Sequence, residues 1–263
     1  MADDGWDPQQ YERFTTERSA PFFDLVGLVE PPAPGARVAD LGCGTGALTA
    51  SLVGRWQPSE LIGLDSSAAM LAEAAPLAEG PLRFVEGDLT APPLEGPFDV
   101  IVSNAALQWV PDHAQVLARW TALLAPGGQL AVQVPANVGH PAHVAAGEVA
   151  DGAPFFEALG GDVPPDTVHT VAPPETYAAV LDELGFGRQH VRLQVYGHHL
   201  PSTADVVEWT KGTSLTRFRT RMEPARYDEF VDRYRQRVLD VLGDHAPYFY
   251  AFRRILLWGR RPA

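Results

Sequence analysis

Short apolar runs bounded by polar residues recur along the first half of the chain. These strand-like runs lie at residues 37–41, 61–65, 82–85, 98–103 and 129–135, the last after a Pro-Gly-Gly turn. Between them, apolar side chains recur with helical spacing at residues 47–56, 67–75 and 112–124. Strands and helices that alternate in this way are typical of βαβ units, whose parallel strands are buried on both faces.

The second half of the chain is less regular. We expect loops and short helices in residues 136–175, followed by helices at 176–184, 204–211 and 224–242. Two further strand-like stretches lie at 189–200 and 248–258. With right-handed crossovers, the whole pattern predicts an α/β fold, a Rossmann-like, doubly wound, mostly parallel sheet of seven strands with a helical insertion near the C-terminus.

Length and composition fit one domain over residues 1–263. A chain of 263 residues that is 46% hydrophobic can bury a core without disulfides, and its one cysteine, Cys43, has no partner for one. The first ten residues are acidic, unlike a signal peptide, and no apolar run approaches the roughly 20 residues of a membrane helix. His140 and His143 alone are too few ligands for a metal site. We therefore expect a cytoplasmic protein that binds neither membrane nor metal.

Charge is unevenly distributed along the chain. The formal net charge of −13 argues against a nucleic acid partner. Residues 202–263 nevertheless carry 12 basic and 8 acidic side chains, against 8 and 25 in residues 1–201. A coding bias toward arginine explains this excess, and so does an anionic substrate received by C-terminal arginines. Both explanations stay open.

A glycine-rich loop follows the first predicted strand. Residues 40–46 read DLGCGTG and precede the first predicted helix. Glycines let the backbone turn tightly and approach a ligand closely. Compared with the dinucleotide motif G-x-G-x-x-G, the third glycine comes one residue early, which disfavours an NAD-dependent oxidoreductase. The carboxylate of Asp40 is awkward for a pyrophosphate but suits a ligand that carries an ammonium and a sulfonium group.

Polar side chains end the next three predicted strands. Asp65 lies 25 residues after Asp40, near the roughly 20-residue spacing of a ribose-binding acid. Its carboxylate can accept hydrogen bonds from both ribose hydroxyls. Asp88 can accept one from an adenine amino group, and Asn104 ends the fourth strand at the floor of the same crevice. We therefore expect a nucleoside site at the carboxyl edge of the sheet.

Together these motifs resemble those of the class I S-adenosylmethionine-dependent methyltransferases. The ordered set DLGCGTG, LDSS, GDL and LAPGG lies within residues 36–134. The resemblance implies S-adenosyl-L-methionine as cofactor and S-adenosyl-L-homocysteine as product. The cofactor site that it implies comprises Asp40, Gly42, Gly44, Asp65, Ser66, Met70, Asp88, Leu89 and Asn104.

Segments outside this core resemble the trans-aconitate methyltransferases, and the likeness covers nearly the whole chain. They are residues 6–19, 104–113 (NAALQWVPDH) and 133–137 (QVPAN). The resemblance implies a carboxyl O-methyltransferase that forms a methyl ester on trans-aconitate or a similar small polycarboxylate. It also implies an N-terminal helical lid at 1–30, with Tyr11 and Arg18 as cofactor contacts, a cofactor-binding core at 31–135 and substrate-side helices and last strands at 136–263.

Fewer residues point to the acceptor. We expect Gln108 and Trp109, which follow the fourth strand, to position it, with Trp109, His198 and Arg217 as contacts. In the family, a Thr-Gly-Leu-Arg-Pro-like stretch carries an arginine that can meet substrate carboxylates. Residues 213–217 of this chain read TSLTR, with the arginine one place later. This departure affects the expected substrate more than the expected reaction, since arginine remains the residue suited to a carboxylate.

A carboxylate acceptor is already ionised at pH 7, so its methylation needs no catalytic base. Two alternatives stay open. One is a methyltransferase for another small acceptor, a malonyl thioester, a quinone precursor or a natural-product hydroxyl. The other is a non-catalytic nucleotide-binding protein. A hydroxyl acceptor would require a base, for which His198 or His199 is the candidate, whereas we expect His113 at the surface. We expect a monomer or a weak homodimer.

Overall fold

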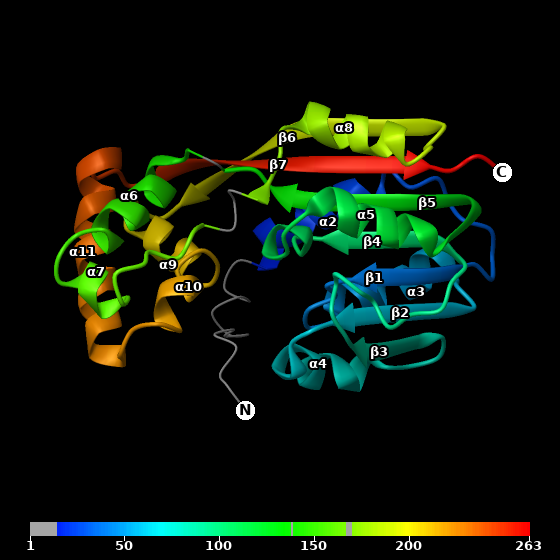
Figure 1. Cartoon of the computed structure of the whole chain (residues 1–263), viewed down its shortest axis with the longest axis horizontal. Coiled ribbons are helices and arrows are strands. Elements are labelled where there is room, and N and C mark those ends of the chain that lie inside the picture. Colours follow the sequence, from blue (N-terminus) through cyan, green and yellow to red (C-terminus); the bar gives the residue numbers. More distant parts are fainter. Residues whose placement is uncertain (1–14, 138, 167–169) are drawn as a thin grey trace. The chain divides into compact units, whose positions relative to one another are not determined.

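A computed structural model describes residues 15–137, 139–166 and 170–263 of the chain (Figure 1). The chain forms two compact units. The sheet unit contains residues 16–136, 170–194 and 254–263, and the helical unit contains the described residues of 137–166 together with 195–253. No described helix is long and apolar enough to cross a membrane.

The sheet has seven strands in the order β3-β2-β1-β4-β5-β7-β6. Their bounds are β1 Arg37–Leu41, β2 Glu60–Asp65, β3 Leu82–Glu86, β4 Phe98–Asn104, β5 Leu124–Pro135, β6 Arg188–Leu200 and β7 Tyr248–Arg260. The first five strands pair in parallel, and β7 is antiparallel to β5. The strand order reverses between β1 and β4. In open α/β sheets, ligands bind outside the carboxyl ends of the strands at such a reversal.

Helices cover both faces of the sheet in the sheet unit. They are α2 Thr15–Val26, α3 Ala47–Trp56, α4 Ala68–Ala74, α5 His113–Ala122 and α8 Pro174–Glu183. One apolar cluster joins β1 and β2 to Trp120 of α5 and Tyr177 of α8. A second joins the alternate strand residues to Phe22 of α2 and Trp56 of α3. Because neighbouring strand residues belong to different clusters, the strands are buried on both faces, as the apolar runs predict.

The helical unit is built from helices around an aromatic core. They are α6 Pro141–Ala150, α7 Phe155–Ala158, α9 Asp205–Lys211, α10 Thr216–Arg219 and α11 Pro224–Leu242 (Figure 1). Trp209, Phe218, Phe230 and Tyr234 are fully buried in this core. The last three helices form the predicted insertion between the last two strands.

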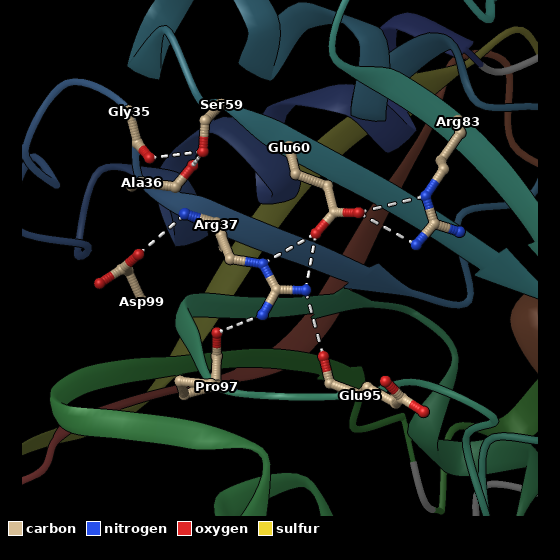
Figure 2. Close-up of polar contacts among 9 residues, drawn as sticks. All are labelled: Gly35, Ala36, Arg37, Ser59, Glu60, Arg83, Glu95, Pro97 and Asp99. Carbon is tan, nitrogen blue, oxygen red and sulfur yellow. Dashed lines mark hydrogen bonds and ion pairs between the residues drawn. The ribbon is translucent and has the colours of Figure 1, made fainter.

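An ion-pair network ties together the starts of the strands (Figure 2). Glu60, at the start of β2, accepts hydrogen bonds from Arg37 at 2.8 Å and from Arg83 at 3.1 Å. The guanidinium of Arg37 also donates to the backbone oxygen of Pro97, and the backbone N–H of Arg37 donates to the carboxylate of Asp99. These contacts lie at the amino ends of β1 and β2, away from the carboxyl ends where ligands bind in such folds.

The fold class predicted from the sequence is confirmed. The strand at 37–41 and the helices at 47–56 and 224–242 have the predicted bounds. The fifth strand differs, because it begins at Leu124 rather than after the turn. Phe98 pairs with Leu124 but Val100 pairs with Gln129, so the Pro-Gly-Gly turn bulges out of a strand that continues on both sides.

The expected surface position of His113 is wrong. Its side chain is buried, and its Nδ1 lies 2.6 Å from the hydroxyl of Tyr177 in α8. That hydroxyl also accepts a hydrogen bond from the backbone N–H of Ala172. The sequence around His113 does not predict this burial, because the residue that covers it, Tyr177, lies 64 residues away in the chain.

Candidate functional site

The loop after β1 begins with a glycine that the packing requires. Gly42 has φ 84°, and a Cβ built on it would lie 2.1 Å from the Cβ of Ala106. Its N–H donates to the carbonyl of Leu64 in β2 at 2.7 Å. Only glycine combines this conformation with so close an approach. The loop is thereby held against the ends of β2 and β4.

The second glycine of the loop, Gly44, has a positive φ and borders open space. Gly44 has φ 56°, and among the described residues no atom beyond its two chain neighbours lies within 4 Å of a Cβ built there. Its N–H donates a hydrogen bond to Oδ2 of Asp65 at 2.9 Å. The backbone at Gly44 therefore borders open space next to a carboxylate, which a ligand could fill.

The carboxylate of Asp65 is oriented by the backbone on both of its oxygens. Oδ1 accepts from the N–H of Ser67 at 2.9 Å, and Ser67 caps α4 by accepting from the N–H of Met70. Each carboxylate oxygen retains a second lone pair, so Asp65 can still accept from two hydroxyls of a ribose. Ser66 is exposed beside it, and Met70 is buried.

Asp40 is a buried carboxyl group directly before the glycine loop. It is 3% exposed, and its Oδ2 accepts a hydrogen bond from Thr49 of α3 at 2.6 Å. Burial, together with the negative charge of Asp65, raises the pKa of this carboxyl to about 7. A cationic ligand would favour the ionised form of Asp40. Thr49 is not among the residues predicted from the sequence, although its hydroxyl lies in the first turn of α3, where such a contact can form.

Asp88 follows β3 and is exposed. It accepts a hydrogen bond from the N–H of Thr90 at 2.7 Å, which holds the pKa of its carboxyl below the ordinary value. Leu89, next to it, is buried, and its carbonyl accepts from the indole of Trp120. Asp88 is thus an ionised acceptor next to an apolar side chain, a combination that suits a nucleobase with an amino group.

Two amide oxygens, one on the last residue of β4 and one shortly after it, are buried and have no hydrogen-bond partner in the described part of the chain. They are Oδ1 of Asn104 and Oε1 of Gln108. The Gln108 side chain is fixed, because its Nε2 donates to the carbonyl of Ala105 at 2.7 Å. Trp109, the next residue, is half-buried. Since buried acceptors without a partner are costly, these oxygens fit a ligand that brings donors.

The remaining acceptor candidates belong to the helical unit. The Arg217 side chain is 11% exposed, and its Nη1 lies 2.8 Å from Oδ2 of Asp166. His198 is buried, with its ring centroid 5.1 Å from that of Trp209, whereas His199 is exposed. Arg217 is therefore a buried cation, and His198 is part of an aromatic core.

Two predicted cofactor contacts cannot be placed. Tyr11 lies outside the described residues, and Arg18 lies in α2, but its side chain is outside the described part. A hydrogen bond links Gly44 to Asp65, and the charge of Asp65 contributes to the raised pKa of the Asp40 carboxyl. Among the described residues, no three potential metal ligands come together. The pair of His140 and His143 is explained otherwise, since His143 contacts Asp166 at 2.9 Å.

Comparisons with known proteins show the family to which the chain belongs. Residues 38–128 match a family described as "Methyltransferase domain". The chain is 44% identical over 260 residues to a trans-aconitate 2-methyltransferase of Deinococcus radiodurans, covering 98% of both chains. It is 38% identical over 266 residues to one of Streptomyces avermitilis, covering 98% of this chain and 97% of the relative.

A solved structure shares the fold at lower identity. It is phosphoethanolamine N-methyltransferase 2 of Haemonchus contortus in complex with S-adenosyl-L-methionine. The TM-score is 0.57 and the identity is 17%, and the match covers 93% of this chain and 53% of that one. This chain is a class I S-adenosylmethionine-dependent methyltransferase and belongs to the family of the trans-aconitate 2-methyltransferases.

Proposed function

We propose that this methyltransferase transfers a methyl group to a carboxylate oxygen of trans-aconitate or a similar small polycarboxylate. The products are a methyl ester and S-adenosyl-L-homocysteine. The observation that carries the proposal is the 44% identity, over 98% of both chains, to a protein named for this reaction. The buried arginine of the helical unit supports it, since arginine is the side chain suited to carboxylates.

The cofactor would be held by the sheet unit. Asp65 would accept from the ribose hydroxyls, Asp88 and Leu89 would hold the adenine, and Asp40 would face the ammonium end of the methionine part. Support comes from the orientation of the Asp65 carboxylate and from the open space at Gly44. The full proposed set is Tyr11, Arg18, Asp40, Gly42, Gly44, Asp65, Ser66, Met70, Asp88, Leu89 and Asn104.

The reaction would depend on positioning rather than on proton transfer. The cofactor supplies an electrophilic methyl group on a sulfonium. The acceptor carboxylate is ionised at neutral pH, so no side chain has to remove a proton. Gln108 and Trp109 would orient the acceptor, and Arg217 and His198 would contact it. Alignment of this kind can supply about 7–11 kcal/mol of the barrier.

We also propose that the enzyme acts on a free small molecule, without nucleic acid, as a monomer or a weak homodimer in the cytoplasm. The net charge of −13 supports the absence of nucleic acid, because phosphate binding requires a basic surface.

Transfer of labelled methyl groups to a panel of acceptors tests the proposed substrate class. The panel contains trans-aconitate, cis-aconitate, citrate, a malonyl thioester and a catechol. We expect the highest kcat/KM with trans-aconitate. Transfer to the thioester or the catechol alone would replace the proposed acceptor. Cofactor binding without any transfer would favour a non-catalytic protein.

A further inference from the structure

Three polar side chains of the helical unit meet at one oxygen atom. Oδ2 of Asp166 lies 2.9 Å from Nδ1 of His143 and 2.8 Å from Nη1 of Arg217. The three side chains come from α6, from the segment after α7 and from α10. Their side chains are only 9%, 4% and 11% exposed. These three residues, His143, Asp166 and Arg217, are called the Asp166 cluster. The cluster is a buried polar network rather than a surface ion pair.

The Asp166 cluster contains buried polar atoms that are not satisfied. Nε of Arg217 and Nε2 of His143 are buried and have no hydrogen-bond partner among the described residues. The hydroxyl of Ser214, three residues before Arg217, is in the same state. The guanidinium of Arg217 thus has an N–H that no described acceptor uses, and a second unused hydroxyl lies three residues before it in the sequence.

Apolar surroundings make these unused donors costly. Cζ of Arg217 lies 4.5 Å from the ring centroid of Phe218. The hydroxyl of Tyr234, whose charge would act on Arg217, is already hydrogen-bonded to the hydroxyl of Thr210 at 3.2 Å. Burial lowers the pKa of Arg217 and Asp166 opposes that shift, but an arginine side chain stays charged in proteins. A buried donor without an acceptor loses its hydration without compensation. A ligand that brings acceptor oxygens would remove this cost.

On the basis of the proposed function, we infer that His143 and Asp166 are positioning residues that hold Arg217 to bind a carboxylate of the acceptor. A guanidinium paired with the carboxylate that is methylated would stabilise its negative charge and weaken it as a nucleophile, so Arg217 would bind a second carboxylate of the same molecule. The Asp166 cluster would therefore select acceptors with at least two carboxylates. Asp166 would act through Arg217, and His143 would act through Asp166.

A matched pair of substitutions at His143 tests the inference. His143→Phe removes the donor to Asp166, whereas the side-chain amide of His143→Asn can still donate from nearly the same place. We expect His143→Phe to raise the KM for trans-aconitate about tenfold or more, with kcat changed by less than about threefold. His143→Asn should keep a KM within about threefold of the wild type. Cofactor affinity should stay unchanged in both.

Two further variants separate this role from a purely structural one. Arg217→Gln should raise the KM for trans-aconitate and remove the preference for trans-aconitate over crotonate, a monocarboxylate. Arg221→Gln is the control, because Arg221 is half-exposed and faces the exposed Asp162 at 3.7 Å. Binding of propane-1,2,3-tricarboxylate in the presence of S-adenosyl-L-homocysteine, which has no methyl group to transfer, is measured by calorimetry and reports the same site without turnover. It should weaken in His143→Phe and in Arg217→Gln but not in Arg221→Gln.

The outcomes distinguish the inference from the function on which it rests. A wild-type protein that binds the cofactor but does not methylate trans-aconitate contradicts the proposed function. If the wild type is active and His143→Phe keeps its KM and its tricarboxylate affinity, the positioning role is wrong. If His143→Phe does not fold, equal KM values for Arg217→Gln and the wild type still overturn the inference.

Discussion

The backbone N–H of Gly44 donates a hydrogen bond to Oδ2 of Asp65 at 2.9 Å. This contact joins the loop after β1 to the end of β2, the two segments in which the sequence places the cofactor. The other oxygen of Asp65 is held by the N–H of Ser67. The carboxylate is therefore oriented before any ligand binds, and such preorganisation lowers the entropic cost of binding.

Substitution of Asp65 should weaken cofactor binding. Asp65→Ala removes charge-assisted hydrogen bonds to the ribose, so we expect a loss of roughly 1.5–3 kcal/mol in binding free energy. Asp65→Asn should lose less, because one oxygen remains as an acceptor. Titration calorimetry with S-adenosyl-L-homocysteine measures both. Glu73→Gln, an exposed substitution on α4, is the control. An unchanged dissociation constant in Asp65→Ala would mean that the ribose lies elsewhere.

Two glycines of the loop should respond differently to alanine. Gly42→Ala should destabilise the fold, because its Cβ would clash with Ala106 at 2.1 Å. The methyl group of Gly44→Ala meets no atom of the described part of the chain beyond the adjacent residues, so the substitution should cost only the backbone strain of a positive φ, about 1–2 kcal/mol. It should nevertheless reduce cofactor affinity, because the added methyl group enters the open space.

Gly35→Ala is the matched control for the strain at Gly44. Gly35 also has a positive φ, and no atom of the described residues beyond its chain neighbours lies within 4 Å of a Cβ built on it. It precedes β1, at the opposite end of this strand from the glycine loop, so its substitution tests strain without touching the proposed site. Urea unfolding and cofactor titration of the three variants check the prediction. Equal cofactor affinity in Gly44→Ala and Gly35→Ala would contradict a ligand at Gly44.

Cofactor binding should depend on pH through Asp40. Its pKa is raised by burial to about 7, so a cation that prefers the ionised carboxylate must displace a proton at lower pH. We expect the dissociation constant to rise about five- to tenfold between pH 7.5 and pH 6. Asp40→Asn should bind more weakly and lose this dependence. A wild-type pH profile in Asp40→Asn would show that another group titrates.

The same carboxyl should affect the stability of the free protein. Because its pKa is higher in the folded than in the unfolded chain, the folded state retains a proton that the unfolded state has released. The stability contributed by Asp40 is complete below about pH 4 and declines as the pH rises toward 7. The difference in Tm between Asp40→Asn and the wild type should therefore grow in favour of the variant across this window. Scanning calorimetry without ligand measures it.

The buried pair of His113 and Tyr177 should be structural. Tyr177→Phe leaves the imidazole and the N–H of Ala172 without their partner, so we expect a loss of about 1–3 kcal/mol in stability. Burial lowers the pKa of His113, and stability from its neutral form is lost as the pH falls below its ordinary value of 6.5. Urea unfolding measures the loss, with Tyr248→Phe as control. A large change in cofactor affinity would instead place Tyr177 in the site.

The sheet could be predicted because its signals are local. Residues 37–41 form a short apolar run followed at once by glycines, and both features depend only on neighbouring residues. The bulge at Gly127 was less accessible, since it depends on how β5 pairs with β4 on either side of the turn. The turn motif by itself does not show that β5 already begins before the turn, at Leu124.

The contacts that the sequence did not reveal are long-range. His113 is covered by Tyr177, 64 residues away. Asp166 contacts His143, which lies 23 residues before it, and Arg217, which lies about 50 residues after it. Nothing in the neighbourhood of Asp166 distinguishes it from the other acidic residues of the chain. Glycine and acidic motifs, by contrast, identify a cofactor site because their spacing is set by one loop and the strand ends beside it.

The chemistry of the product tests the central claim most directly. The protein is incubated with trans-aconitate and S-adenosyl-L-methionine that carries a ¹³C-labelled methyl group, and the product is followed by NMR. We expect one new methyl signal at an ester position, formed in equal amount with S-adenosyl-L-homocysteine and lost on mild alkaline hydrolysis. A labelled product that survives alkali, or no labelled product while the cofactor is bound, would contradict carboxyl methylation.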